Sequence, residues 1–263
     1  MLKYLSAAGA VALSVTNVHA QGIEFDAATL NIETTTIAVE GFGDFSLLSY
    51  GGDVALTYGA FGVQLGVNRV TDSDMESFAF PFEVDYTGFE VHGFYDVTEN
   101  LRAGVFYARD DYSGNPSDVL GVEAIWTPTI FRVEGRLASF DEEPDSGWQY
   151  NFSAQADLGE GFNPFVQVRR NNYDNGAGYY FRTEVGLSYR PLDTVEFYGS
   201  LGAGTNDFGG GIVDEETSVN LGFRLHFGNR DGSSPSSYDR EPGPSSLGLD
   251  GDSDMLFRYI GFF

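Results

Sequence analysis

The chain has 263 residues, of which 39 are Asp or Glu and only 14 are Lys or Arg, so its formal net charge is −25. This charge excludes a general affinity for nucleic acid and makes an anionic lipid surface repulsive. Cysteine is absent, which excludes disulfides and cysteine-based metal or nucleophile chemistry. The 23 phenylalanines and 15 tyrosines agree with a β-rich protein.

Residues 1–20 have the features of an export signal. Lys3 precedes an apolar stretch from Leu5 to Val15, and Val18-His19-Ala20 is a small-x-small cleavage pattern. We therefore predict a signal peptide over 1–20. Its apolar stretch is shorter than the roughly 20 residues of a spanning helix, and no later segment reaches that length. A mature protein in a membrane would then be a closed β-barrel, the only other structure that pairs every backbone group in lipid.

The mature chain repeatedly alternates apolar and polar residues with a period of two. In one segment Trp148, Tyr150 and Phe152 alternate with Gln149 and Asn151, which predicts a strand with one apolar and one polar face. The same pattern predicts strands over 28–40, 46–58, 61–70, 86–96, 100–109, 118–127, 129–139, 148–158, 163–172, 178–190, 193–203 and 216–228. The predicted fold is all-β: a single transmembrane antiparallel up-and-down barrel over 21–228, with about 12 strands and a range of about 10 to 14.

The connections between these strands alternate in length. The short ones are 59–60, 97–99, 128, 159–162 and 191–192, and the longer ones, rich in Asp, Gly and Asn, are 71–85, 110–117, 140–147, 173–177 and 204–215. Bacterial barrels have short periplasmic turns and long outer loops, so we expect the long connections outside. The short connection from Gly41 to Gly43 does not fit this scheme. We expect the acids of the long connections, including the run from Asp214 to Glu216, in solvent; divalent cation binding there is an alternative that no spaced ligand motif supports.

The two faces of the later strands differ in character. Over 178–190 one face is Tyr179, Phe181, Thr183, Val185, Leu187 and Tyr189, with aromatic residues at both ends as in the girdles of a membrane barrel. The other face carries Arg182, Glu184, Ser188 and Arg190, which suits a watery lumen. A small soluble barrel would have the same alternation with its apolar face inside. The aromatic ends and the Gly, Ser and Gln of the charged faces favour the membrane barrel.

The segment from Asn220 to Phe227 is the most specific local pattern. It has a polar residue at Asn220, a glycine at Gly222, and apolar or aromatic residues at Leu225 and Phe227. This pattern resembles the C-terminal assembly signal of Gram-negative bacterial outer-membrane β-barrel proteins, and with the strand rhythm the chain as a whole resembles a porin-like member of that class. The resemblance implies that the barrel assembly machinery reads the strand ending at Phe227. In most such proteins that aromatic is the last residue, whereas here 36 residues follow.

The composition changes after the last predicted strand. Residues 229–254 are rich in Ser, Pro, Gly and Asp, which predicts a flexible linker, and the aromatic segment from Met255 to Phe263 follows it. We therefore assign 229–263 to a flexible acidic tail. A second assembly signal and a true last strand at 255–263 is the alternative, but it would make thirteen strands, so the even-number rule favours 227 as the end of the barrel.

The sequence indicates no catalytic centre, cofactor site or metal site. His92 and His226 fall on the polar faces of different strands, and no motif supplies a nucleophile for either of them. We expect them to be lumen histidines bound to neighbouring polar groups.

Charged residues of the polar faces are the candidate functional residues. We predict that they line the pore: Arg132, Glu134, Arg136, Arg169, Arg182, Glu184 and Arg224. One interpretation is a set of ion pairs that brace the lumen; the other is a basic track down a narrow pore with an acidic mouth. Both can hold together, because a paired arginine can still present donors to a passing carboxylate.

The sequence thus predicts a porin-like channel in the outer membrane, reached by export through the periplasm, that passes small hydrophilic solutes and is not an enzyme. Its expected partners are outer-membrane lipid, the barrel assembly machinery and small polar solutes, with no nucleic acid; the sequence leaves the oligomeric state open. Alternatives are a non-conducting structural or adhesive barrel, a barrel hydrolase, and a soluble exported β-barrel that binds a ligand.

Overall fold

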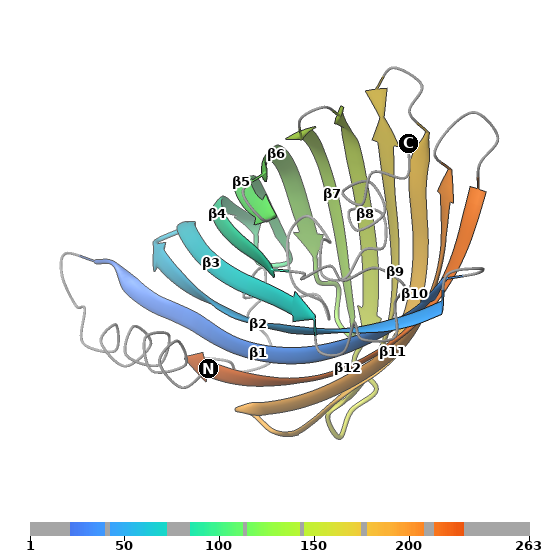
Figure 1. Ribbon diagram of the computed structural model, residues 1–263. Helices are drawn as coiled ribbons and strands as arrows, with labels where there is room; N and C mark the ends of the chain where they lie inside the picture. The colour runs from blue at the N-terminus through green and yellow to red at the C-terminus, as the bar shows by residue number, and fades with distance from the viewer. Residues whose placement is uncertain are drawn as a thin grey trace.

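A computed structural model describes residues 22–39, 43–72, 85–112, 115–142, 145–174, 178–207 and 213–228. These form twelve antiparallel strands in one closed barrel (Figure 1). The strands are β1 (Glu24–Val39), β2 (Gly43–Tyr58), β3 (Phe61–Asp72), β4 (Asp85–Thr98), β5 (Leu101–Tyr112), β6 (Asn115–Trp126), β7 (Phe131–Glu142), β8 (Asp145–Ala156), β9 (Phe162–Tyr173), β10 (Tyr179–Leu192), β11 (Val195–Asp207) and β12 (Val213–Gly228). Among the described residues, no helix is long and apolar enough to cross a membrane.

The predicted strand number and the predicted strands are confirmed. The largest differences in boundary are at the start of β1, which begins at Glu24 rather than 28, and at the end of β11, which reaches Asp207 rather than 203. The first hairpin forms despite its short connection, because β1 and β2 pair continuously from Ala27 to Val39. The predicted signal peptide (1–20) and tail (229–263) lie outside the described residues.

Every strand pairs with its sequence neighbours, and β12 closes the barrel by pairing with β1. The register runs from Ala27 opposite Gly228 to Val39 opposite Glu216, so the strand that ends in the assembly-signal pattern is the closing strand. Among the described residues, the barrel therefore closes through β12 and β1.

Two connections that were predicted to be long are short in the structure, so these two predictions are wrong. The strands of the β5–β6 hairpin pair as far as Tyr112 opposite Asn115, and those of the β7–β8 hairpin as far as Glu142 opposite Asp145. Only residues 113–114 and 143–144 then separate the strands. Backbone pairing continues through these polar segments because a ladder needs no apolar side chains once the hairpin is aligned.

The alternation of side chains divides the barrel wall into two faces. Large apolar residues on one face are exposed, including Val185 at 53% and Leu221 at 59%, while the residues between them are buried. Aromatic contacts mark the end with the short connections, where Phe162 stacks on Tyr189 with ring centroids 4.5 Å apart. A closed barrel with an apolar exterior is a membrane-spanning wall.

Candidate functional site

Contacts between strands that are not neighbours identify the polar face as the interior. His92 of β4 reaches across β5 to Glu123 of β6, with Nδ1 and Oε1 2.7 Å apart. Arg182 of β10 reaches across β11 and donates to the Ser218 hydroxyl of β12 at 2.8 Å. Side chains two strands apart can meet in this way only on the concave side of a curved sheet. The charged residues therefore point into the barrel, and the apolar residues point outward.

The first ion-pair network lies on the interior of β4 to β7. Arg136 Nη2 is 2.8 Å from Glu134 Oε1, and its Nε is 3.1 Å from Glu123 Oε2. Both contacts are close enough for ion pairs, but neither is aligned for a hydrogen bond. His92 binds Glu123 from the other side, and Arg132 lies 3.5 Å from Glu134 at the network's edge. The two glutamates, on β6 and β7, are thus held by groups from β4 and β7.

A second network on β10 to β12 is centred on Glu196. Arg190 of β10 donates to Oε2 at 2.7 Å, and Arg224 of β12 donates to Oε1 at 2.9 Å. His226 Nε2 is 3.0 Å from Oε2. One carboxylate thus ties β10, β11 and β12 together near the short-connection end of the barrel.

A third network depends on small residues in β11. Arg182 binds Glu184 at 3.2 Å and Ser218 at 2.8 Å, and Tyr180 donates to Glu216 at 2.7 Å. The Arg182 side chain crosses β11 over Gly202. A Cβ on Gly202 would collide with the Ser218 hydroxyl and would lie 3.1 Å from Arg182 Nη2. Glycine at this position therefore leaves the space through which β10 reaches β12.

Aromatic rings lie over other interior glycines, and arginine guanidinium groups lie over the same rings. The Phe94, Phe106 and Tyr198 rings occupy the places where Cβ atoms of Gly62, Gly121 and Gly222 would stand. The guanidinium groups of Arg102, Arg136 and Arg224 lie 4.0, 5.8 and 4.4 Å from the centroids of the same three rings. A cation over a ring face is stabilised by the ring's quadrupole, so these rings help to hold the three arginines in place.

All seven predicted pore-lining residues lie on the interior face, but they do not form one group. Arg132, Glu134 and Arg136 meet in the first network, Arg182 and Glu184 in the third, and Arg224 in the second. Arg169 is buried opposite Arg182 in the β9–β10 register. His92 and His226 are interior residues bound to glutamates, as expected.

One predicted location is wrong. Glu216 was expected in a solvated loop, but β12 begins at Val213, so Glu216 is an interior strand residue and is 5% exposed. It accepts a hydrogen bond from Tyr180 and lies 3.8 Å from Arg182. The acidic run hid residues 213–215, by which β12 extends beyond its predicted start at 216, because the signal of alternation is weak where both faces are polar.

Sequence reasoning also missed apolar residues of the interior. Ile37, Leu47, Val70, Val119 and Phe140 are buried on the inward face, toward the barrel end opposite the turns at 59–60 and 99–100. Here both faces of a strand carry apolar residues, so a period of two alone does not show them. This end of the interior is therefore less polar than the middle.

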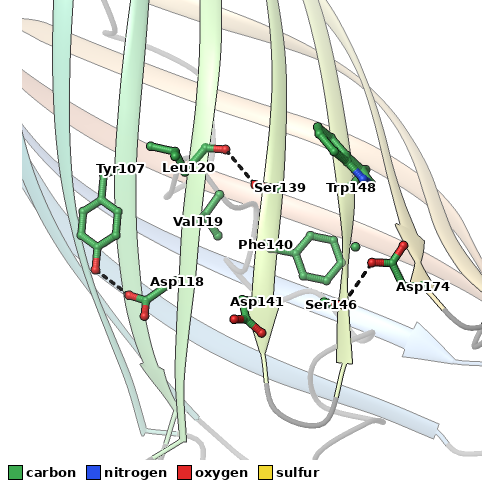
Figure 2. A pocket seen from close by; sticks show the side chains of 11 residues that line it. Tyr107, Asp118, Val119, Leu120, Ser139, Phe140, Asp141, Ser146, Trp148 and Asp174 are labelled. Carbon is green, nitrogen blue, oxygen red and sulfur yellow. Dashed lines mark hydrogen bonds between the residues drawn. The ribbon is translucent and has the colours of Figure 1, made fainter.

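The exterior has a shallow groove of about 440 Å³ across β5 to β9, toward the same end of the strands (Figure 2). Tyr107, Leu120 and Trp148 border the smaller Ser139, and the Tyr107 hydroxyl donates to Asp118. Ser146 donates to Asp174 at 3.0 Å. In the described part of the chain, no group of three or more His, Asp or Glu side chains could hold a metal ion.

Comparison with solved structures finds the same fold among outer-membrane channels. The chain is similar to the KdgM porin in complex with disordered oligogalacturonate (TM-score 0.57, 10% identity, 76% of this chain and 99% of that one). It is also similar to the NanC porin (0.58, 11%, 74% and 98%) and to an outer-membrane channel from Pseudomonas putida F1 (0.56, 12%, 80% and 98%). No family model matches the chain, and no curated protein is similar to it in sequence. The chain thus has the fold of these porins and channels, a closed β-barrel, with an apolar exterior.

Proposed function

We propose that this outer-membrane barrel is a porin-like channel through which small hydrophilic solutes diffuse passively. The observation that carries the proposal is the combination of an apolar exterior with an interior of charged and amide side chains in one closed barrel. A protein that only had to fill its interior would be stabilised more simply by apolar packing. Polar groups inside a membrane barrel instead favour water and polar solutes in the lumen.

The strand number supports a narrow channel. Barrels of eight strands are filled by their own side chains, and porins of 16 to 18 strands enclose wide aqueous channels. A barrel of twelve strands lies between these limits, so its side chains determine how much of the lumen stays open. Similar solved structures include a porin bound to an oligogalacturonate, a polar solute with many hydroxyl groups. Small polar solutes are therefore the class of molecule that we expect to pass through this barrel.

Amide side chains of β8 and β9 provide the part of the wall best suited to such solutes. Gln149, Asn151, Gln167 and Asn171 lie on the interior of these neighbouring strands. An amide both donates and accepts hydrogen bonds, as a hydroxyl group does, so this stretch can exchange partners with a passing solute. Arg169 and Arg182 lie beside it and add donors for a carboxylate.

A non-conducting structural barrel is the second candidate, because the three ion-pair networks tie neighbouring and next-neighbour strands together. Networks of this kind brace a wall whether or not solute passes. We assign no catalytic role: both mature-chain histidines that sequence reasoning singled out are engaged by buried glutamates, Glu123 and Glu196.

Single-channel recording tests the proposal. The purified mature chain inserted into planar bilayers should produce stepwise, ohmic conductance. Conductance should fall when Gln167 is enlarged to Trp on the interior wall, and should not change when the exterior residue Val166 is replaced by Ile. Absence of conductance steps from protein shown to be folded would leave the structural barrel as the function.

We also propose that the barrel assembly machinery reads β12. Asn220 and Gly222 lie on the interior face of this strand, whereas Phe227 is exposed on the outer face. A Phe227→Ala variant should accumulate in the periplasm if this aromatic is recognised, while Val213→Ala, at the other end of the same strand, should assemble normally.

A further inference from the structure

Outward-facing arginines occur at one level of the barrel. Within the described residues, the exterior arginines are Arg69 on β3, Arg109 on β5 and Arg170 on β9, and each is the ninth residue of its strand. All three strands start from a short connection. The other seven described arginines belong to the interior networks or the interior wall.

This level corresponds to the edge of the hydrocarbon region. Eight steps at about 3.3 Å make roughly 26 Å along a strand, or about 20 Å of height at a tilt of about 40°. The apolar band of such barrels is about 25 Å tall, so the backbone at this level lies about 5 Å from the far edge, a gap that the long arginine side chain can span. On β9 the outward residues below Arg170 are Phe162, Pro164, Val166 and Val168, so apolar side chains end where the arginine begins. With the short connections in the periplasm, this edge belongs to the outer leaflet.

Arg109 and Arg170 occupy equivalent positions but have different neighbours. Arg109 faces a carboxylate, because its Nη1 is 3.5 Å from Asp118. Asp118 also accepts a hydrogen bond from the Tyr107 hydroxyl (Figure 2). Arg170 instead donates through Nε to the neutral Asn172 Oδ1 at 2.7 Å, and its guanidinium lies 4.8 Å from the Tyr179 ring centroid. No described carboxylate pairs with Arg170.

The Arg170 side chain is thus oriented without being neutralised. The Asn172 hydrogen bond and the Tyr179 ring restrain the guanidinium, and only Nε is used by the protein contact. The two Nη groups carry the remaining donors, in the fork geometry that matches a phosphate. Phe181 on β10 and Tyr150 on β8 are the register partners of Arg170 and form apolar surface on both sides of it.

We propose that Arg170, Asn172 and Tyr179 form a binding site for the phosphate of an outer-leaflet lipid, with the lipid's acyl chains packed against Tyr150, Val168 and Phe181. The phosphate accepts hydrogen bonds from the Arg170 Nη groups at the level of the headgroups. The chain as a whole is strongly acidic and repels anionic lipid, and this local cation provides a position on β8 to β10 where such a lipid can be held.

Native mass spectrometry of the mature chain, purified from outer membranes in detergent, tests the site. The probes are bisphosphorylated lipid A and the same lipid after removal of its phosphates. Wild-type protein should bind the phosphorylated probe more tightly. Arg170→Gln should weaken that binding about tenfold, which corresponds to the loss of one charge-assisted hydrogen-bonding group, and should abolish the preference for phosphate.

Arg109→Gln is the matched control, since it removes an exterior arginine at the equivalent position whose charge is already paired. It should change binding less than twofold. Tyr179→Leu, which keeps the charge but removes the ring, should weaken binding by an intermediate factor and provides a second variant if Arg170→Gln does not fold. Equal binding of the two probes by wild type, or equal losses for Arg170→Gln and Arg109→Gln, would overturn the proposal.

Discussion

Arg136 offers the most direct test of how the interior is stabilised. Its guanidinium lies between Glu123 and Glu134, and the three side chains are 5%, 0% and 3% exposed. Arg136→Gln removes the cation and leaves two buried carboxylates facing each other across β6 and β7. Glutamine is shorter and neutral, so it cannot compensate both charges.

The expected loss follows from the partners that remain. Removing one member of a buried ion pair costs about 3 to 5 kcal/mol, because the other charge stays buried. His92 still binds Glu123 at 2.7 Å and Arg132 still lies 3.5 Å from Glu134, so we expect a loss near the lower end, about 3 kcal/mol of unfolding free energy. Arg132→Gln is the control: this side chain is 21% exposed at a longer distance, so the loss should be about 0 to 1 kcal/mol.

Urea unfolding of the barrel in lipid vesicles, followed by tryptophan fluorescence, measures both variants. The two tryptophans, Trp126 and Trp148, are exposed on the outer face and therefore report on contact with lipid. The double variant Glu123→Gln/Arg136→Gln should show a coupling energy of about 1 to 3 kcal/mol relative to the two single variants. A loss for Arg136→Gln no larger than that for Arg132→Gln would mean that the ion pairs are solvated rather than buried.

Three further predictions concern the two faces and the topology of the barrel. Val185→Arg on the lipid face should cost about 2 to 4 kcal/mol in the same unfolding assay, whereas Ser153→Arg on the interior should cost about 1 kcal/mol or less; similar losses would mean that the faces are reversed. Gly202→Ala should destabilise the barrel by about 1 to 3 kcal/mol because it blocks the arginine–serine contact across β11, whereas Gly135→Ala, whose Cβ would meet nothing within 4 Å, should change stability by less than about 1 kcal/mol. A protease site inserted after Pro128 should be cut only once the outer membrane is permeabilised, and cleavage on intact cells would contradict the inward orientation of the short connections.

The period of two was sufficient to predict the strands and their faces. In β10, for example, Val185 and Leu187 were expected outside and Arg182 and Glu184 inside, and the structure has them there. This is a local property, because successive side chains of any strand point to opposite faces. The choice of which face meets lipid needed the aromatic residues at the strand ends.

Strand ends were less predictable than strand centres. The pairing of Tyr112 with Asn115 and of Glu142 with Asp145 extends hairpins through segments whose composition is typical of loops. Glu216 was misplaced for the same reason. Strand extension at these ends depends on a neighbouring backbone in register, which the local sequence does not contain.

The sequence by itself determined an all-β chain of twelve strands, each with one apolar and one charged face. Both the strands and their faces follow from the alternation of neighbouring residues. Only the tertiary structure decided which charges meet. Glu196 binds arginines from β10 and β12, and Arg182 reaches Ser218 across Gly202, because barrel curvature brings next-neighbour strands together on the concave side. The tertiary structure also decided that Arg109 faces Asp118 whereas Arg170 faces Tyr179. Partners across a sheet are set by strand register and not by distance along the chain.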